Sequence, residues 1–473
     1  MAKTWATLPG PDPGGGFDLH VDLRGPGVRK GLTDALREAV RGGRLAPGTR
    51  LPSSRTLAAD LGIARNTVAD AYADLVAEGW LTARQGSGTR VAEREVPRPA
   101  APRTPPRAPG TAAYSLLPGL PDLSLFPRAE WLKAARRALA AAPHDAFGYG
   151  DPRGRIELRT ALAGYLARTR GVYAEPGRIV VCSGAVHGLM LLAEVLRRRG
   201  TTDVAVEPYG LPPHWDRLTA AGLRTPPLLM DELGTRTAEL GPLGPGAVLL
   251  TAAHQFPTGT PLSPERRAEA VDWARSTGGL ILEDDYDGEF RYDRQPVGAL
   301  QSLDPDRVVY LGTASKSLAP GIRLGWLVLP TWLAAEVAEA KGPVDWACGA
   351  MDQLTLAEFL DSGAYDRHVR AARQRYRRRR DELVTALAAT EVRLSGIAAG
   401  LHAVLELPEG TEQSVIRSAA WQGLSVLGLG DFRHPDARVP PCDGLVVGYG
   451  TPPPHLWPGA LEALVAALGA ALG

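Results

Sequence analysis

The chain of 473 residues is too long for one ordinary hydrophobic core, so its length predicts several domains, or one large domain with an added module. Hydrophobic residues make up 44% of the chain and charged residues 22%, a composition that excludes wholesale disorder. Because the formal net charge is only +1, any surface that binds nucleic acid must be a local basic patch.

Cysteine content and hydropathy exclude further classes of protein. The three cysteines, Cys182, Cys348 and Cys442, are too few and too widely spaced for a disulfide scaffold or a cysteine-based zinc site, and we expect no metal. No apolar run reaches the roughly 18 residues that a membrane span needs. The first residues lack the apolar segment of a secretory signal. We therefore expect a cytoplasmic protein without membrane contact.

The first predicted domain covers residues 17–92 and contains three short helices. The apolar stripes of the first and third helices are Leu32, Leu36 and Val40, then Val68, Tyr72 and Leu75. Between them, a short helix over 55–61 follows the candidate N-cap residues Ser53 and Ser54 and stops at Gly62. Two short helices joined by a tight turn with a glycine are typical of a helix-turn-helix.

The third helix and the segment after it carry residue types that read DNA. Arg65, Asn66 and Thr67 begin the helix, and the first residues of a recognition helix reach base edges in the major groove. Arg can bind a guanine edge and Asn an adenine edge. The segment WLTARQGSGTRV then predicts two strands around Gly86, which would form the wing.

The preceding helix has a candidate phosphate contact at its start. Ser53, Ser54 and Arg55 open it, and free backbone N–H groups at a helix N-terminus favour a phosphate. Residues 17–92 carry 11 Lys and Arg against 8 Asp and Glu, so the domain is only mildly basic. A winged helix that binds protein is the alternative to one that binds DNA.

Three motifs identify a family for this domain. The runs GRLAPGTRLPSSRTLA, RNTV and GSGT occur in this order within residues 20–92. They resemble the winged helix of GntR-type regulators, in which the same motifs occur at the same spacing. The resemblance implies binding to double-stranded operator DNA.

Residues 93–112 separate this domain from the rest of the chain. They contain six prolines between Pro97 and Pro109, interleaved with arginines. Such a segment cannot continue a helix or a central strand, so we expect a semi-rigid linker. The linker leaves residues 113–473 for a second domain.

Short β-rich runs in the second domain alternate with helical segments, and each run ends at a polar or glycine turn. This pattern predicts a mostly parallel α/β sheet with buried strands. The runs are 179–182, 204–207, 248–251, 280–282 and 308–311. Ligands of such sheets bind beyond the carboxyl ends of the strands, so the residues directly after each run are the candidates.

Three of these turns carry candidate chemistry. Gly184 and Ala185 open a helix after the first run and could hold a phosphate. The run 280–282 is followed by EDDYDGEF, whose carboxylates need cations because buried unpaired charges are costly. Lys316 follows the last run in a chain with only five lysines, which favours a Schiff-base role over a solvated surface position.

The motif S-K-x-x-x-x-x-x-R, formed by Ser315, Lys316 and Arg323, resembles that of fold-type I, class I aminotransferases, which depend on pyridoxal 5′-phosphate. The resemblance covers residues 113–470 and implies that Lys316 forms a Schiff base with the cofactor aldehyde. It implies that Ser315, Arg323, Gly184 and Ala185 bind the phosphate. It further implies roles for Asp284 at the pyridine nitrogen, Tyr286 at the ring 3′-oxygen, Tyr209 in ring stacking and Tyr149 at the phosphate of the neighbouring subunit. Asp285 is the alternative to Asp284.

Two positions depart from the aminotransferase pattern. Phe256, in HQFPTG, stands where an asparagine would contact the 3′-oxygen, which leaves Tyr286 with His254 as a possible helper. Val446, in GLVVGYG, stands where an arginine for the substrate carboxylate is expected. Arg433 and Arg438 lie nearby in the sequence and are candidates to bind the carboxylate of an effector.

The order of winged helix, proline-rich linker and aminotransferase-like domain resembles the MocR family of bacterial transcription regulators. It implies a large domain with a mostly parallel sheet, a smaller C-terminal α/β subdomain and a head-to-tail homodimer. We expect a regulator that senses an amine, an amino acid or pyridoxal phosphate itself through Lys316, without physiological turnover. An active aminotransferase with a DNA-binding module is the alternative.

Overall fold

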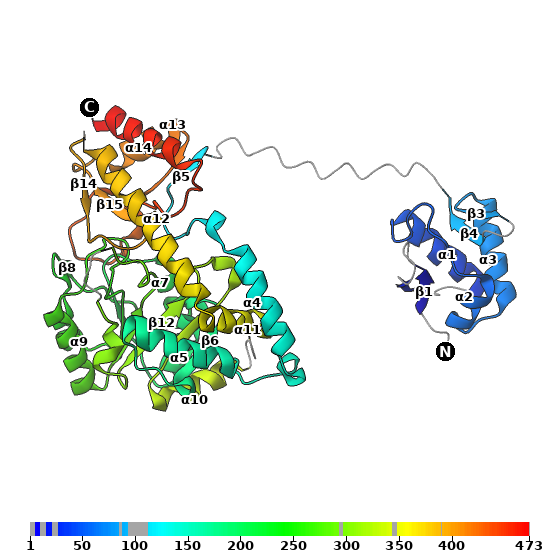
Figure 1. Cartoon of the computed structure of the whole chain (residues 1–473), viewed down its shortest axis with the longest axis horizontal. Coiled ribbons are helices and arrows are strands. Elements are labelled where there is room, and N and C mark those ends of the chain that lie inside the picture. Colours follow the sequence, from blue (N-terminus) through cyan, green and yellow to red (C-terminus); the bar gives the residue numbers. More distant parts are fainter. Residues whose placement is uncertain are drawn as a thin grey trace. The chain divides into compact units, whose positions relative to one another are not determined.

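In this computed structural model, the described residues are 27–84, 88–92, 112–292, 297–342, 348–388 and 390–472, with two further strands near the N-terminus. These two strands, β1 (Trp5–Pro9) and β2 (Gly16–His20), pair in antiparallel fashion. The chain divides into two compact units, Met1–Ala108 and Pro109–Gly473 (Figure 1). Within the described residues, no helix is long and apolar enough to cross a membrane.

The N-terminal unit is a winged helix-turn-helix, as predicted. Its elements are α1 (Val28–Arg41), α2 (Ser54–Leu61), α3 (Arg65–Ala77) and the antiparallel strands β3 (Leu81–Arg84) and β4 (Gly88–Val91). Ser53 is the N-cap of α2, because its hydroxyl accepts a hydrogen bond from the Thr56 amide at 3.1 Å. Gly62 ends α2 with a φ of 68°, a conformation that glycine adopts without strain.

One small core holds the three helices and the hairpin together. The predicted stripe residues Leu32, Leu36, Val68 and Leu75 are buried, but Val40 is only half-buried and Ala39 takes its place. On the surface, ion pairs join α1 to α3. They are Arg29–Asp74 at 2.6 Å and Arg37–Glu78 at 2.7 Å. Exposed pairs of this kind stabilise by at most about 1 kcal/mol each, so the apolar core carries the fold.

The C-terminal unit is built around a six-stranded sheet of order β6-β13-β12-β11-β10-β7. The strands are β6 (Ile179–Cys182), β7 (Val204–Val206), β10 (Ala247–Leu250), β11 (Leu280–Asp284), β12 (Val308–Thr313) and β13 (Gly325–Val328). All five predicted runs are therefore strands; the run 179–182 matches β6 at both ends, and the other four differ from their strands by one or two residues. The sequence reading missed β13, which lies antiparallel between β6 and β12.

Helices cover both faces of this sheet (Figure 1). On one face lie α6 (Ala185–Arg198), α7 (Pro212–Ala220) and α10 (Thr331–Lys341). On the other lie α5 (Ile156–Arg170), α9 (Pro264–Thr277) and α11 (Ala350–Asp361). Side chains of successive strand residues point to opposite faces of the sheet. Leu280 and Leu282 pack on the face covered by α6, α7 and α10, and Ile281 packs on the face covered by α9.

A smaller subdomain follows in the chain. Its four-stranded sheet has the order β14-β15-β18-β17, formed by Arg393–Ser395, Ala403–Glu406, Gly444–Val447 and Leu427–Gly428. Helices α13 (Glu412–Trp421) and α14 (Trp457–Leu472) pack against it. Further elements of the C-terminal unit are the helix α4 (Arg128–Ala141) and the short elements β5 (Tyr114–Ser115), β8 (Met230–Asp231), β9 (Gly234–Thr235), α8 (Leu240–Leu243) and β16 (Leu424–Ser425).

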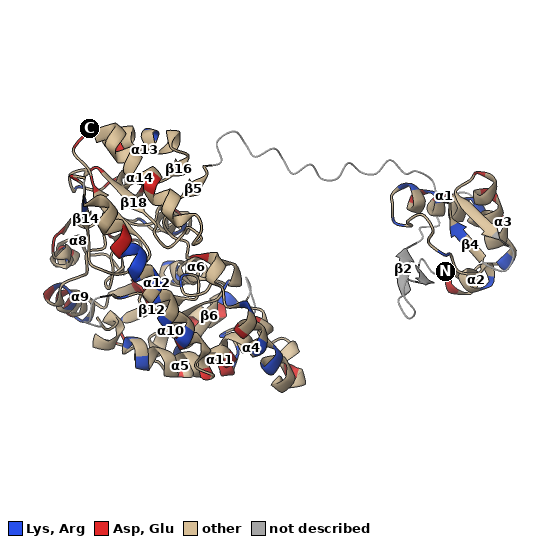
Figure 2. Cartoon of the chain, turned by 45° about the horizontal axis from the view of Figure 1, so that its top comes forward, with Lys and Arg blue, Asp and Glu red and all other residues tan. Residues whose placement is uncertain are grey.

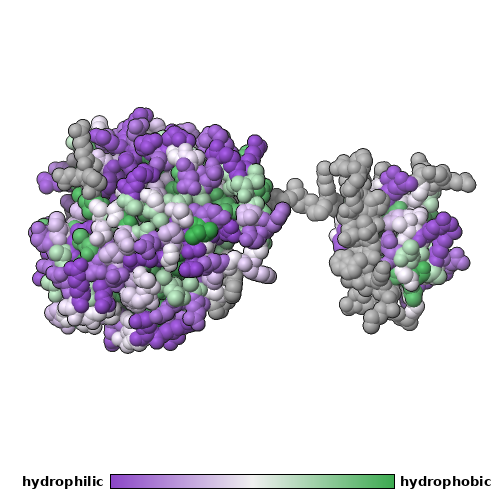
Figure 3. Space-filling model, turned by 60° about the horizontal axis from the view of Figure 1, so that its bottom comes forward, coloured by the Kyte–Doolittle hydropathy of each residue, from purple (hydrophilic) through white to green (hydrophobic). Residues whose placement is uncertain are grey.

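The long helix α12 (Ala364–Leu387) connects the two subdomains, because Tyr365 packs in the core of the large sheet and Tyr376 in that of the small one. Its arginine-rich stretch is mostly exposed, and α12 shows both signs of charge in Figure 2. Arg379 is the exception: it is buried and forms an ion pair with Asp122 at 3.0 Å. The face of the unit seen in Figure 3 is mainly hydrophilic, with hydrophobic residues in small groups.

Candidate functional sites

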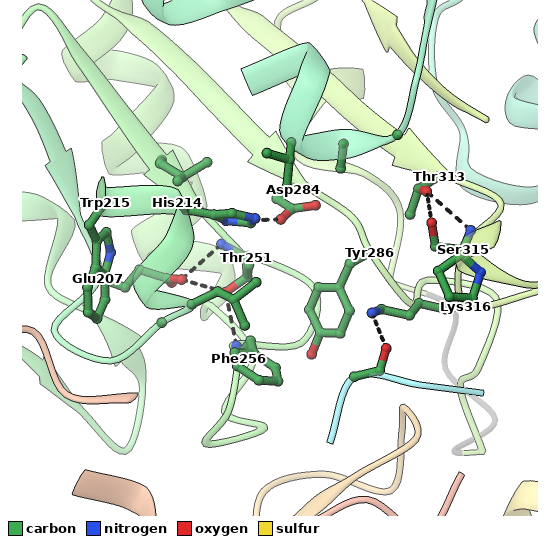
Figure 4. Close-up of a pocket in the computed structure, with 18 of the residues that line it drawn as sticks. Glu207, His214, Trp215, Thr251, Phe256, Asp284, Tyr286, Thr313, Ser315 and Lys316 are labelled. Carbon is green, nitrogen blue, oxygen red and sulfur yellow. Dashed lines mark hydrogen bonds and ion pairs between the residues drawn. The ribbon is translucent and has the colours of Figure 1, made fainter. Parts of the chain in front are cut away.

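A pocket opens at the carboxyl ends of the large sheet, where the topology predicts a ligand. Residues directly after β6, β7, β10, β11 and β12 line it, and Leu401 and His402 of the small subdomain close one side. Figure 4 shows the side chains of Asp284, Tyr286 and Lys316 directed into this space. The pocket therefore brings together three of the side chains that the sequence singled out.

Lys316 presents its amine inside the pocket. The Nζ atom donates a hydrogen bond to the Gly119 carbonyl oxygen at 2.5 Å. Burial lowers the pKa of Lys316 below its ordinary value, and the nearby carboxylates of Asp284 and Asp287 oppose this shift only in part. A lowered pKa increases the fraction of neutral amine, which is the form that attacks an aldehyde.

Asp284 is a buried carboxyl group with one oxygen atom that lacks a hydrogen-bond partner. Its Oδ1 atom forms no hydrogen bond to the described residues. Burial raises the pKa of Asp284 to about 7, although Lys316 acts in the opposite direction. His214 lies 3.9 Å away, but burial lowers its pKa to about 4, so the ring is neutral near pH 7. A protonated pyridine nitrogen would supply the positive hydrogen-bond donor that Asp284 lacks.

Asp285, the alternative, lies in a different environment. It forms an ion pair with Arg170 at 2.6 Å and accepts a hydrogen bond from the Tyr310 hydroxyl at 2.8 Å. It does not line the pocket. The structure thus places Asp284 toward a ligand and Asp285 in an internal network.

The start of α6 forms a cradle for an anion. Gly184 has a φ of 90°, and a Cβ atom there would lie 3.2 Å from the guanidinium of Arg323. Arg323 itself has a left-handed φ of 58° and donates a hydrogen bond to the Ser183 carbonyl. The Ser315 hydroxyl lies 2.8 Å from that of Thr313 at the same side of the pocket. Free helix N–H groups, a guanidinium and a hydroxyl are the groups that hold a phosphate.

The tyrosines of the sequence analysis are not all at the pocket. Tyr209 and Tyr286 line it, whereas Tyr149 is 98% exposed and does not. The role of Tyr149 at a neighbouring subunit stays a prediction.

The two arginines expected to bind a carboxylate do not reach the pocket. Arg433 donates hydrogen bonds to the carbonyls of Ala437 and Val439, the latter at 2.8 Å, and Arg438 pairs with Glu239 at 3.3 Å. Neither arginine lines the pocket. Val446 is fully buried in β18, within an apolar cluster that includes Phe256. The carboxyl-binding role of Arg433 and Arg438 therefore finds no support in this geometry, because both guanidinium groups are held elsewhere.

Sequence reasoning missed several pocket residues, above all Glu207 and His214. Glu207 accepts hydrogen bonds from the Thr235 hydroxyl at 3.0 Å and the Thr251 amide at 3.1 Å, and burial raises its pKa to about 7. The signal for Glu207 was its position as the last residue of the predicted run 204–207; the structure ends this strand at Val206 and leaves Glu207 directly after it. The signal for His214 was Pro212, a residue type that favours the first position of a helix. It places His214 in the first turn of α7, beside the pocket.

The candidate DNA-binding residues lie where the helix-turn-helix predicts them. Arg65 and Asn66 are exposed on the first turn of α3, and Thr67 is half-buried. Ser53 and Arg55 are exposed at the start of α2, and Ser54 is half-buried. The predicted wing contact, Gly86, lies outside the described residues. Within the described residues, no group of three or more His, Cys, Asp or Glu side chains could hold a metal ion.

Comparisons with known proteins agree with both halves of this description. Residues 29–91 match the family of bacterial regulatory proteins called gntR, and residues 120–429 match aminotransferase class I and II. The chain is 34% identical to the HTH-type pyridoxine biosynthesis transcriptional regulator PdxR of Corynebacterium glutamicum, over 89% of this chain and 91% of that protein. It is 31% identical to the probable rhizopine catabolism regulatory protein MocR of Rhizobium meliloti, over 89% and 90%. An archaeal alanine:glyoxylate aminotransferase matches with a TM-score of 0.68 and 25% identity, over 76% of this chain and 91% of that one.

Proposed function

The chain belongs to the MocR-type transcriptional regulators, in which a GntR-family winged helix precedes an aminotransferase-like domain, and we propose that it converts the binding of a small molecule around Lys316 into a change of operator affinity. The observation that carries this proposal is the buried Oδ1 atom of Asp284, which has no hydrogen-bond partner among the described residues and lies in one pocket with Lys316 and the cradle at Gly184.

Pyridoxal phosphate is the cofactor that these residues fit. When bound, it would supply an aldehyde for the Lys316 amine and a pyridine ring whose absorbance reports on its surroundings. Asp284 would hold the ring nitrogen in its protonated form. Ser315, Arg323 and the N–H group of Ala185 would bind the phosphate beside Gly184, whose own N–H donates to the Cys182 carbonyl at 2.8 Å, and Tyr209 would contact the ring face.

We infer that the effector carries no free carboxylate once the cofactor is in place. Among the described residues, Lys316 and Arg323 are the cations that line the pocket, and the cofactor engages both. His402 also lines the pocket, but burial lowers its pKa to about 3, so it stays neutral. A carboxylate would thus meet apolar groups such as Phe256 without a counter-charge, at a cost of several kcal/mol, on the order of 2–7 kcal/mol for a buried unpaired polar group. The pocket therefore fits pyridoxal phosphate as its ligand, or, once the cofactor is in place, an amine without a carboxylate.

The name of the Corynebacterium glutamicum relative is consistent with this choice, because it describes a regulator of pyridoxine biosynthesis. A regulator of the synthesis of a cofactor can respond directly to the concentration of that cofactor when the cofactor is its effector. We propose that the protein acts in the cytoplasm as a head-to-tail homodimer on double-stranded operator DNA. The nearly complete exposure of Tyr149 supports a contact to a neighbouring subunit.

Operator titrations with and without pyridoxal phosphate test this proposal. We expect the dissociation constant of the full-length protein for DNA upstream of its target genes to change by about 5- to 150-fold, the usual range of allosteric coupling. A panel of amino acids, added to the loaded protein, should change it much less. An operator affinity that does not change when pyridoxal phosphate is added would contradict its assignment as the effector.

The alternative function is that of a working aminotransferase, which the fold itself favours. Transamination needs a substrate held by its carboxylate, and the pocket offers no described arginine beyond Arg323 for that purpose. Incubation with amino acids and α-ketoglutarate distinguishes the two. Sustained glutamate formation at ordinary enzyme rates, on the order of 1 per second or faster, would establish the enzyme instead.

A further inference from the structure

Two buried residues behind Tyr286 have no role in the function proposed so far. The Nδ1 atom of His254 lies 2.8 Å from Oδ2 of Asp287 and 3.0 Å from the Tyr286 hydroxyl. His254 and Asp287 are buried and do not line the pocket, whereas Tyr286 does. The His254–Asp287 pair therefore reaches the pocket through its neighbours, by the hydrogen bond to Tyr286 and by a ring contact of His254 with His402, whose centroids lie 5.2 Å apart.

The chemistry of the three groups assigns the protons. A carboxylate can only accept, so Nδ1 of His254 carries the proton that lies between it and Asp287. This nitrogen then has no lone pair left, and the Tyr286 oxygen must act as its second acceptor. The O–H group of Tyr286 is then not used by His254, and it can donate either to Asp287 or to a ligand atom in the pocket. Burial, the charges of Asp287 and Asp284 and a hydrogen bond to Asp287 raise the pKa of Tyr286 well above its ordinary value, so the hydroxyl keeps its proton.

The small subdomain packs against the other side of this pair. Gly400 has a left-handed φ of 72°, and a Cβ atom there would lie 2.4 Å from Cε1 of His254 and 2.5 Å from Oδ2 of Asp287. The Gly400 amide donates to the Phe290 carbonyl at 2.7 Å, and its own carbonyl accepts from the Tyr449 hydroxyl at 2.8 Å. Only a glycine in this fixed position leaves room for the pair.

We propose that His254 and Asp287 are positioning residues that hold Tyr286 as a hydrogen-bond donor to a ring oxygen of the pocket ligand. This inference rests on the proposed cofactor site. The donor is needed because Phe256 offers no side-chain polar atom to that oxygen, while its ring lies edge-on to Tyr286 with centroids 5.8 Å apart. The opposing interpretation is that the pair only joins the two subdomains and has no effect on the ligand.

A comparison of two ligands separates these interpretations. The probes are pyridoxal phosphate and its 3-deoxy analogue, which lacks the ring oxygen, and each is titrated into the ligand-free full-length protein. We expect the parent protein to prefer pyridoxal phosphate by about 10- to 100-fold, the usual effect of one hydrogen bond to a charged group. His254→Leu and Tyr286→Phe should each remove most of this preference, and the double variant should lose no more than Tyr286→Phe alone.

Further variants serve as controls. His254→Gln keeps an N–H donor and should retain part of the preference. Gly400→Ala should reduce it, because its Cβ would displace the pair, whereas Gly410→Ala should not. Gly410 has a similar φ of 80° but nothing within 4 Å of a Cβ, so it matches the backbone strain without the contact.

Each other outcome overturns the inference in a recognisable way. If His254→Leu weakened the binding of both probes equally, the pair would only join the two subdomains and would not act on the ring oxygen. An unchanged preference in Tyr286→Phe would mean that the tyrosine gives its proton to Asp287. Failure of the parent protein to bind either probe would overturn the cofactor site and this inference together.

Discussion

The two units of the molecule treat charge in opposite ways. In the winged helix, Asp74 and Glu78 lie at the surface, and the guanidinium groups of Arg29 and Arg37 hold their pKa values below the usual range. The C-terminal unit instead holds four carboxyl groups whose pKa values are raised to about 7 by removal from water, three of them buried and the last, Glu289, half-buried. These are Glu207, Glu283, Asp284 and Glu289. A DNA-binding surface needs accessible charge, whereas a pocket can keep an unfavourable buried group that a ligand then satisfies.

Asp285 shows that burial alone does not explain this difference. It is as buried as its neighbour Asp284, yet it has Arg170 and Tyr310 as partners. The same acidic segment therefore contains one carboxyl group used for structure and one left for a ligand. The predictions below test this contrast between the two units, beginning with the largest effect.

Lys316→Ala should abolish covalent retention of pyridoxal phosphate, because no other lysine among the described residues lines the pocket. Mass spectrometry after borohydride reduction measures this retention directly. Lys133→Ala is the matched control, since Lys133 is exposed on α4. Covalent cofactor that persists on Lys316→Ala would show that another residue forms the link.

The four acids with raised pKa values should lower the stability of the ligand-free C-terminal unit as the pH rises from about 4 to about 7. Their folded pKa values are near 7 and their unfolded values near 4, so the unfolded state releases protons first and is favoured over this range. The lowered pKa values of His214 and His402 act in the opposite direction below about pH 6.5, so the four acids set the sign because they are more numerous. Each unit of pKa difference corresponds to about 1.4 kcal/mol.

The winged helix should respond to pH with the opposite sign. The lowered pKa values of Asp74 and Glu78 give it stability above the ordinary carboxyl range that is lost on acidification. Hydrogen exchange of the full chain at several pH values resolves the two units. Asp284→Asn should reduce the pH dependence of the stability of the C-terminal unit. A stability of that unit that rises with pH would contradict the raised pKa values of its acids.

Leu61→Ala should destabilise the winged helix by about 2–5 kcal/mol, because this side chain is fully buried in its small core. Operator binding should weaken accordingly, while pyridoxal phosphate should bind as before. Operator and cofactor titrations on one preparation measure both. A parallel loss of cofactor affinity would show that the two units fold together.

Arg65→Ala should weaken operator binding by about 1–3 kcal/mol and relax the preference at one base pair. Competition with single-base operator variants measures that preference. A loss of affinity that is equal for all DNA sequences would indicate that Arg65 contacts the phosphate backbone instead.

Arg55→Ala should have the smallest effect, a similar weakening on all DNA sequences with a decrease of about one in the salt slope. Binding isotherms at several salt concentrations give this slope. A loss confined to the specific operator would indicate that α2, rather than α3, reads the bases.

Much of the fold could be predicted because its signals are local. Apolar residues at helical spacing predicted α1 and α3, and buried β-rich runs predicted five of the six central strands. The strand β13 was not predicted, because nothing in its four residues shows that the chain returns to the sheet between β6 and β12. Its position depends on pairing with strands distant in sequence.

The sequence alone determined the winged helix, the mostly parallel sheet and the placement of Lys316 after a strand, since all three follow from residue patterns within short segments. The tertiary structure decided that Asp284 rather than Asp285 faces the pocket, that Arg433 and Arg438 do not, and that Gly400 packs on His254. Successive residues at the end of a strand point in different directions, and their partners come from remote parts of the chain. A side chain's role in the site therefore depends on which distant segments the fold brings beside it.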